Sequence, residues 1–331
     1  MSVILVSAKN RAFLIAAALA FAALALALVM HGREHADTDI VSVELNPQDP
    51  SQTRQGALIY RGGIDIPKMG RNLGGLSALR WDEGSARLLA LSDDARFAWI
   101  ALEERADRLV GLRSLEMGEL LGLEGEPLSG KQSADAESLT RSAQGGWLVG
   151  FERDHRVWRY PEIDARPLKT DIDPVAIMGP LEANGGTETL AVDERALFLC
   201  AERYAPAPQP NCFWKAENMG PSALRVEPPE DMRMVEAVAT DADITSDATL
   251  FVLFRSYDPA RGNVIGVVAL GPDGAQQDIA TIRAPISVDN FEGLAVREDA
   301  GRTFIYLVSD DNFSSNQRTL LLKFEWGAPA Q

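Results

Sequence analysis

Residues 187–192 read Thr-Glu-Thr-Leu-Ala-Val, and residues 196–203 read Ala-Leu-Phe-Leu-Cys-Ala-Glu-Arg. The first segment is short and apolar with an acidic residue near its start, and a turn separates it from the second, which ends on charged residues. Short apolar runs bounded by turn residues are typical of β-hairpins and not of helices. The same layout recurs four more times, at residues 74–94, 136–153, 243–255 and 291–311.

The spacing of these repeats predicts an architecture. The second strands end near positions that are 60, 50, 53 and 54 residues apart, namely Ser92, Glu152, Glu202, Arg255 and Ser309. A third strand often follows, so each unit is a meander of three or four strands. Units of this length are typical of β-propeller blades, which stack because no single blade can bury both of its faces. The sequence therefore predicts an all-β fold, a β-propeller of five blades, or of six if residues 109–128 hold a degenerate one.

The rest of the chain divides around this repeat region. An apolar run over residues 12–30 follows Lys9 and Arg11, which is the pattern of a cleaved export signal or an uncleaved membrane anchor. We therefore divide the 331 residues into a signal peptide or membrane anchor (1–36), a polar linker (37–55) and a propeller (56–331). Residues 57–60 are expected to pair with residues 320–324 and close the ring.

Either form of the N-terminal helix places the propeller in the periplasm or another extracytoplasmic compartment, secreted or anchored. If the helix stays uncleaved, it is the one segment expected to contact a membrane.

The charge balance restricts the class of partner. The chain has 32 basic and 48 acidic side chains, a net charge of −16, and no block rich in Lys or Arg. Nucleic acid is excluded on this ground, because its recognition depends on clustered basic charge. Removing residues 1–36 takes away three basic side chains and one acidic one, which deepens the net charge to −18. The expected partner is a small-molecule ligand, or alternatively a protein of the cell envelope.

Two cysteines, Cys200 and Cys212, flank one Pro-rich loop. In an oxidising compartment such a pair is expected to form a disulfide, and two buried free thiols are the alternative. Serine hydrolase chemistry is disfavoured, because the sequence has no Gly-x-Ser-x-Gly motif and a catalytic triad could use only His155 of the exported part.

Carboxylates recur at matching places in the repeats. Glu137, Glu188 and Glu292 lie near the start of three first strands, Asp243 approximates the same place in a fourth, and Gly75 breaks the pattern. Since the first strand of each blade lines the central channel, these side chains are expected to converge at one mouth.

The ends of the second strands add Asp93 and Asp310. Converging carboxylates need a cation, a shared proton or arginines, and oxygen-rich clusters favour Ca²⁺ or Mg²⁺. The candidate ligands of a divalent cation, with Ca²⁺ as the candidate cofactor, are Glu137, Glu188, Glu292, Asp93 and Asp310.

Arginines near these carboxylates leave the interpretation open. Arg153 and Arg203 directly follow acidic residues at the strand ends, so each carboxylate could instead be a brace between blades, or an acid or base in catalysis. Alternatively Arg153, Arg203 and Arg318 hold an anionic substrate beside a bound metal.

Several motifs resemble one known family. They are Gly74-Gly75-Leu76-Ser77, Leu91-Ser92-Asp93-Asp94, Asp289-Asn290-Phe291-Glu292-Gly293-Leu294, and Ser309-Asp310-Asp311-Asn312-Phe313 with Gln317-Arg318-Thr319-Leu320-Leu321. Over about residues 73–324 the chain resembles the phytase-like β-propellers labelled "esterase-like activity of phytase". The resemblance implies an exported or membrane-anchored propeller whose assigned activity is generic.

Two functions follow from the residues and the resemblance together. The first is a divalent-metal-dependent phosphoester or ester hydrolase, for which metal-dependent propeller phytases offer an analogy at the level of the fold. The second is a non-enzymatic binding or scaffold propeller of the cell envelope.

Overall fold

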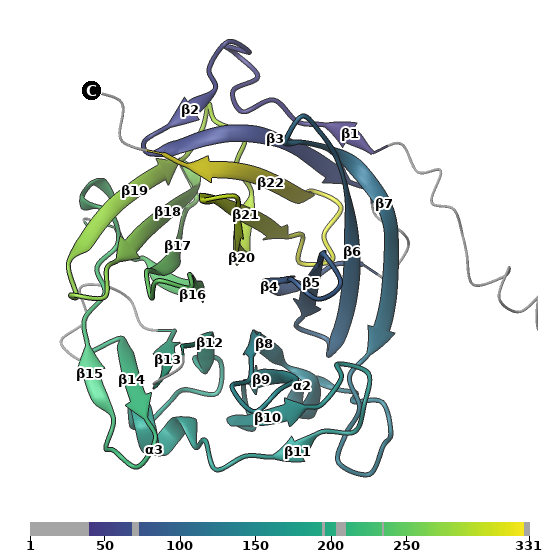
Figure 1. Ribbon diagram of the computed structural model, residues 1–331, viewed down its shortest axis with the longest axis vertical. Coiled ribbons are helices and arrows are strands. Elements are labelled where there is room, and N and C mark those ends of the chain that lie inside the picture. Colours follow the sequence, from purple (N-terminus) through teal and green to yellow (C-terminus); the bar gives the residue numbers. More distant parts are fainter. Residues whose placement is uncertain (1–39, 68–72, 194–195, 203–209, 234, 328–331) are drawn as a thin grey trace, which may run out of the picture. The chain divides into compact units, whose positions relative to one another are not determined.

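Five antiparallel sheets are arranged as blades around a central channel (Figure 1). The computed structural model describes residues 40–67, 73–193, 196–202, 210–233 and 235–327, so the predicted N-terminal signal or anchor lies outside the described residues. The innermost strands are the first of each blade: β4 (Leu76–Asp82), β8 (Ala136–Arg141), β12 (Thr187–Val192), β16 (Val238–Ile244) and β20 (Asn290–Asp299). The predicted all-β propeller is confirmed, and the number of blades is five.

Four of the blades have four strands each. Outward from the channel they are β4, β5 (Arg87–Ser92), β6 (Arg96–Arg105) and β7 (Arg108–Glu119); β8, β9 (Trp147–Phe151), β10 (Arg156–Tyr160) and β11 (Leu168–Lys169); β12, β13 (Ala196–Ala201), β14 (Cys212–Ala216) and β15 (Ser222–Leu224); and β16, β17 (Leu250–Asp258), β18 (Gly262–Leu270) and β19 (Gln276–Ile282). The considered sixth blade within residues 109–128 was wrong, because this segment supplies β7 and the loop after it.

Short helices lie in the connections: α2 (Lys131–Ala134), α3 (Pro174–Met178) and the 3₁₀ turn η1 (Glu230–Met232). In the described parts of the chain, no helix has the length and apolar character needed to cross a membrane.

The last blade joins the two ends of the propeller. From the channel it contains β20, β21 (Arg302–Asp310), β22 (Thr319–Trp326) and β3 (Leu58–Ile66), and β3 also pairs with the short strands β1 (Val41–Ser42) and β2 (Arg54–Gln55). The predicted closure is confirmed, since Phe324 pairs with Tyr60 in the β22–β3 register. Hydrogen bonds between β22 and β3 therefore close the ring, because they join the last strand of the chain to a strand from the start of the propeller.

Part of the segment predicted as a linker belongs to this closing blade. Besides β1 and β2, it contributes Leu45, which is 1% exposed and packs in the core, and whose carbonyl accepts the Ser287 N–H at 2.7 Å. The stretch from Val41 to Leu45 alternates apolar and polar residues, as a strand does, and the division of the chain at residue 55 overlooked this short pattern.

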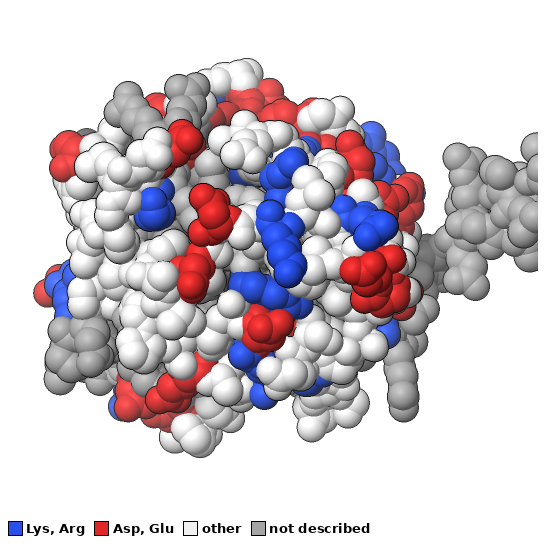
Figure 2. Space-filling view, turned by 90° about the horizontal axis from the view of Figure 1, so that it is seen from below, with Lys and Arg blue, Asp and Glu red and all other residues white. Residues whose placement is uncertain are grey.

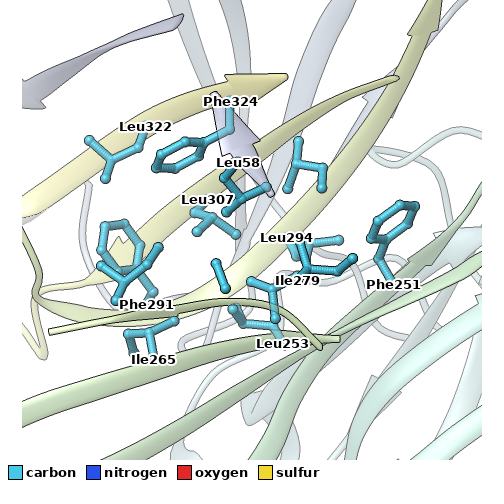
Figure 3. Close-up of a cluster of buried hydrophobic side chains, with 14 of the residues drawn as sticks. Leu58, Phe251, Leu253, Ile265, Ile279, Phe291, Leu294, Leu307, Leu322 and Phe324 are labelled. Atoms are coloured by element: carbon cyan, nitrogen blue, oxygen red, sulfur yellow. The ribbon is translucent and has the colours of Figure 1, made fainter. Parts of the chain in front are cut away.

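The core consists of apolar layers between neighbouring blades. Figure 3 shows the layer between the closing blade and the β16–β19 blade, where Phe291 and Leu294 of β20 meet Leu253 of β17 and Ile265 of β18. Both faces of a blade are covered in this way, so its middle strands are nearly continuous apolar runs. Each buried large side chain stabilises the fold by about 1.5–3 kcal/mol.

Arg80 lies across the channel and connects the inner strands of four blades. Projecting from β4, its guanidinium forms a bidentate ion pair with Asp241 of β16, with N–O distances of 2.8 and 2.9 Å. The same group donates to the backbone carbonyls of Leu190 on β12, at 2.7 Å, and Leu294 on β20, at 2.9 Å. Arg80 is 2% exposed and Asp241 is fully buried, so this pair is kept from water.

Asp241 completes the connection through its own acceptor oxygens. Its carboxylate accepts backbone N–H groups from Leu79 of β4, at 3.2 Å, and Leu294 of β20, at 2.8 Å. A buried ion pair is stabilising only when its remaining polar atoms are satisfied, and here three inner strands supply the partners of one carboxylate.

We predict that Arg80→Met destabilises the protein by about 3–5 kcal/mol, because it leaves the Asp241 charge buried without its partner. Arg80→Lys should not restore stability, since an ammonium cannot make the bidentate pair. Urea unfolding measures both effects. Arg105→Met is the matched control, because Arg105 is 77% exposed and pairs with Glu103 of its own strand. A loss below about 1 kcal/mol for Arg80→Met would contradict the assigned role.

Candidate functional site at the channel mouth

Every inner strand contains a β-bulge near its start. The register against the second strand shifts at the same place in all five blades, and the extra residues are Ser77, Glu137, Glu188, Thr240 and Glu292. We call these five the bulge ring. Glu137 is repelled electrostatically by Glu292, and Glu188 by Glu137, so the ring brings together the three glutamates that the sequence predicted to converge. The bulges explain the convergence, because a bulge re-aims a side chain that would otherwise follow the strand alternation.

The structure corrects two positions of the expected pattern. Thr240, and not Asp243, is the member of the bulge ring in β16, and Ser77, and not Gly75, is the member in β4. Asp243 lies deeper in the channel, where its carboxylate accepts the Val296 N–H at 2.8 Å and lies 3.8 Å from the Arg80 Nε. Asp243 lies three residues after Thr240 and Gly75 lies two residues before Ser77, so these two repeats were aligned out of register with the other three.

A second ring of charged residues follows the ends of the second strands. In each blade, the residue just before the bulge pairs with a residue of the second strand, and the ring member directly follows that second residue. The five members are Asp93, Glu152, Glu202, Arg255 and Asp310. We call these five the strand-end ring. Antiparallel pairing places the end of a second strand beside the start of the first, so both rings lie at one mouth of the channel. Among these ten described positions, seven are carboxylates and one, Arg255, is basic.

Two basic side chains lie beside the rings, Lys131 of α2 and Arg153 of the turn after β9, and sequence reasoning missed Lys131. Lys131 donates to Asp93 at 2.5 Å and to Asp135 at 2.8 Å, and Arg153 donates to Asp135 at 2.5 Å. Asp135 was also missed, although its place two residues before Glu137 was a signal for it. Lys131 belongs to a Gly-containing stretch with no strand pattern, so nothing in the sequence indicated that its side chain contacts Asp93 and Asp135.

The other predicted residues lie apart from the rings or outside the described residues. Arg318 pairs with Asp289, at 3.5 Å, and not with a ring carboxylate. Arg203 falls outside the described residues. Cys200 and Cys212 are joined by a disulfide between the neighbouring strands β13 and β14.

Crowding and burial keep protons on several of these carboxyls. Burial, followed by repulsion from Glu152, raises the pKa of Glu137 well above its usual range. Burial, followed by repulsion from Glu137, does the same to the pKa of Glu188, whose carboxyl also hydrogen-bonds with that of Glu152. Glu188 therefore keeps its proton to a higher pH than a glutamate in water.

Arg255 moderates this effect without removing it. Its Nε lies 3.2 Å from Glu292, and its Nη2 lies 4.0 Å from Glu202. Burial raises the pKa of both glutamates, and Arg255 opposes the rise. Burial, followed by repulsion from Glu292, raises the pKa of Asp310 to about 8.

Two triads of carboxylates are close enough to hold a metal ion. They are Asp135–Glu137–Glu152 and Glu152–Glu188–Glu202, each with one oxygen per residue and all three oxygens within 4.8 Å of one another. Glu152 belongs to both and is fixed by the Gly186 N–H, which donates to one of its oxygens at 2.7 Å. The donors are all oxygens, the set that suits Ca²⁺ or Mg²⁺ better than zinc. Of the predicted ligands, Glu137 and Glu188 lie in these triads, whereas Glu292, Asp93 and Asp310 do not.

Acidic side chains predominate at the mouth, whereas the outer surface carries charges of both signs. Figure 2, which looks onto the blades of β8–β11 and β12–β15 from outside, shows a band of basic side chains flanked by acidic ones. The net charge of −16 is therefore not one uniform acidic shell.

Residues 71–313, more than half of the chain, match the phytase-like family described as "Esterase-like activity of phytase". The chain belongs to this family. The match includes both carboxylate rings of the phytase-like propeller and confirms the resemblance seen in its motifs. A comparison with curated proteins finds no match.

Solved structures with a similar arrangement include the α-L-arabinofuranosidase PaAbf62A from Podospora anserina, at 12% identity and a TM-score of 0.46, covering 81% of this chain and 95% of that one. A GH62 α-L-arabinofuranosidase catalytic domain from Coprinopsis cinerea has 10% identity, a TM-score of 0.47, and coverage of 83% and 99%. An exo-1,5-α-L-arabinanase from a bovine ruminal metagenomic library has 9% identity, a TM-score of 0.39, and coverage of 78% and 95%. At this level of similarity, no activity is carried over.

We predict that the metal-free protein loses stability as the pH rises from about 4 to about 8. The folded-state pKa of Asp310 is raised to about 8, above an unfolded value of about 3.9, so its stabilising contribution is complete below pH 4 and is lost as the pH passes through 8. Asp310→Asn removes the ionisation and should flatten this decline, because an amide oxygen can still accept the Asn312 N–H, now bonded at 2.7 Å.

Thermal unfolding in chelator at several pH values measures this effect. Asp273→Asn is the matched control, since the exposed Asp273 makes the same kind of turn hydrogen bond, to the Ala275 N–H at 3.0 Å. An equal pH dependence for the wild type and Asp310→Asn would show that Asp310 is ionised across this range.

Proposed function

We propose that this phytase-like propeller is an exported hydrolase of phosphate or carboxylic esters that uses a divalent cation, Ca²⁺, held at the channel mouth. The observation that carries the proposal is the pair of carboxylate triads that share Glu152. Their oxygens are close together and crowded enough to retain protons, so a divalent cation would replace protons there and relieve the repulsion. A cation bound there supplies a Lewis acid that polarises the ester oxygen and activates water.

The chain's own residues divide into three roles in this proposal. Glu137, Glu152, Glu188 and Glu202, with Asp135, hold the cation. Arg255 attracts the anionic part of the substrate, because it is itself a member of the strand-end ring. Arg153 and Arg318 are not ring members, and they pair with Asp135 and Asp289. Glu292, which lies outside both triads and whose pKa burial raises, can accept a proton from water or give one to the leaving group.

Two further observations support an extracytoplasmic location. The apolar run of residues 12–30 follows two basic residues, as in export signals and anchors. The Cys200–Cys212 disulfide also fits an oxidising compartment. The proposed partner is a small-molecule ester.

The test combines calcium binding with turnover. We expect Ca²⁺ to raise the unfolding temperature of the chelated protein, and to switch on hydrolysis of p-nitrophenyl phosphate or p-nitrophenyl acetate, which chelator abolishes. Glu152→Gln should lower kcat/KM on the order of 100-fold and weaken the calcium shift, because Glu152 belongs to both triads. Glu162→Gln, on the exposed surface, is the control and should change neither readout.

Two results would overturn the hydrolase. A calcium shift without turnover would make the cation structural. If calcium changes nothing, no ester is hydrolysed and Glu152→Gln alters stability alone, the carboxylates are braces of a binding or scaffold propeller.

A further inference from the structure

Phe313, in the turn between β21 and β22, combines exposure with backbone strain. Its side chain is 47% exposed, although Phe is a residue that folding normally buries. Asn312 and Phe313 both have positive φ angles, of 48° and 50°. A bulky residue in the left-handed region is an outlier, and such strain persists only where the surroundings enforce it.

The residues that enforce this conformation come from the strand-end ring and its neighbour. Asp310 accepts the Asn312 N–H at 2.7 Å, and Asp311 accepts the Phe313 N–H at 2.9 Å. The Asp311 carbonyl also accepts the Ser314 N–H at 2.7 Å. The turn that presents Phe313 is thus fixed by the same aspartate that lies at the channel mouth.

The ring of Phe313 rests on two glycines beside the mouth. A Cβ on Gly74 would lie 2.9 Å from the Phe313 ring, and a Cβ on Gly75 would lie 2.6 Å from it, so both positions must lack a side chain for the ring to lie there. The Asp93 carboxylate lies 2.3 Å from the same Gly75 Cβ position. The aromatic ring and a carboxylate of the strand-end ring are therefore neighbours.

These contacts do not account for the exposed part of the ring. A brace between the first and last blades would gain most from complete burial, and glycine at position 313 would relieve the strain. The chain instead keeps a strained aromatic residue whose covered side rests on Gly74 and Gly75 and whose remaining surface is open to water next to the carboxylates.

We propose that Phe313 is a specificity-determining residue, which packs against an aromatic ring in the alcohol part of an ester while the ester group lies at the carboxylate rings. The substrate class is therefore monoesters of aromatic alcohols. This inference rests on the proposed hydrolase function. Stacking of a ring on an aromatic side chain accounts for a preference of up to about tenfold in binding.

The test uses the calcium-loaded full-length protein and three substrates: phenyl phosphate, cyclohexyl phosphate and n-hexyl phosphate. We expect the lowest KM for phenyl phosphate. Phe313→Leu should raise that KM about tenfold with kcat little changed, and Phe313→Tyr, which keeps the ring, should retain the preference. Equal KM values for phenyl and cyclohexyl phosphate would overturn the inference. Met219→Ala, 67% exposed at the opposite end of its blade, is the control.

Binding of phenylphosphonate and methylphosphonate, followed by calorimetry, separates this inference from the hydrolase proposal. Neither ligand can be hydrolysed, so the tighter binding of phenylphosphonate and its loss in Phe313→Leu stand even if no ester is turned over. The inference is overturned if the wild type binds both phosphonates equally, or if Phe313→Leu keeps the preference with its unfolding temperature unchanged. If Phe313→Leu is destabilised, Phe313→Tyr decides, and its loss of the preference would also overturn the inference.

Discussion

The ion pair of Arg80 and Asp241 is the interaction on which the arrangement of the blades depends. Five blades around an axis are related by contacts between neighbours, and apolar layers alone fix neither the distance to the axis nor the height of one blade relative to the next. A guanidinium has five donors in a rigid plane, so it can define the position of several strands at once. Arg80 does so for β12, β16 and β20 from its own strand β4. The carboxylate rings lie nearer the mouth of the channel than Arg80 does.

The bulges place charged side chains at one end of this regular arrangement of blades. A strand without a bulge alternates its side chains between the two faces of its blade, and in a propeller both faces are covered by neighbours. The extra residue leaves that alternation, so Glu137, Glu188 and Glu292 avoid burial in apolar layers. A glutamate could not be accommodated one position before Glu137 or two positions after it, where Ala136 and Leu139 pack in the core.

The sequence predicted the blades better than the mouth. Hairpins such as residues 187–203 carry their own pattern, and the pairing of β22 with β3 followed from the need to close the ring. The glutamates were found because they repeat. Thr240 was missed because register depends on a bulge that has no sequence signal, and Lys131 and Asp135 because their approach depends on a loop. Arg80 has no counterpart in other blades, so a search for repeats passes over the residue that connects them.

Charge balance at the mouth determines what can bind there. The two rings and Asp135 carry eight carboxylates. Among the described residues, three positively charged side chains form ion pairs with them: Lys131, Arg153 and Arg255. Full ionisation would leave a large uncompensated negative charge in a partly buried space, which is why the pKa values rise. Protons and metal cations compete for such a site, so a cation gains affinity as the pH rises and the protons leave. An anionic ester alone would be repelled from the mouth. In the proposed function, a bound cation would therefore have to precede the substrate, and Phe313 would act on a ligand that the cation had already admitted.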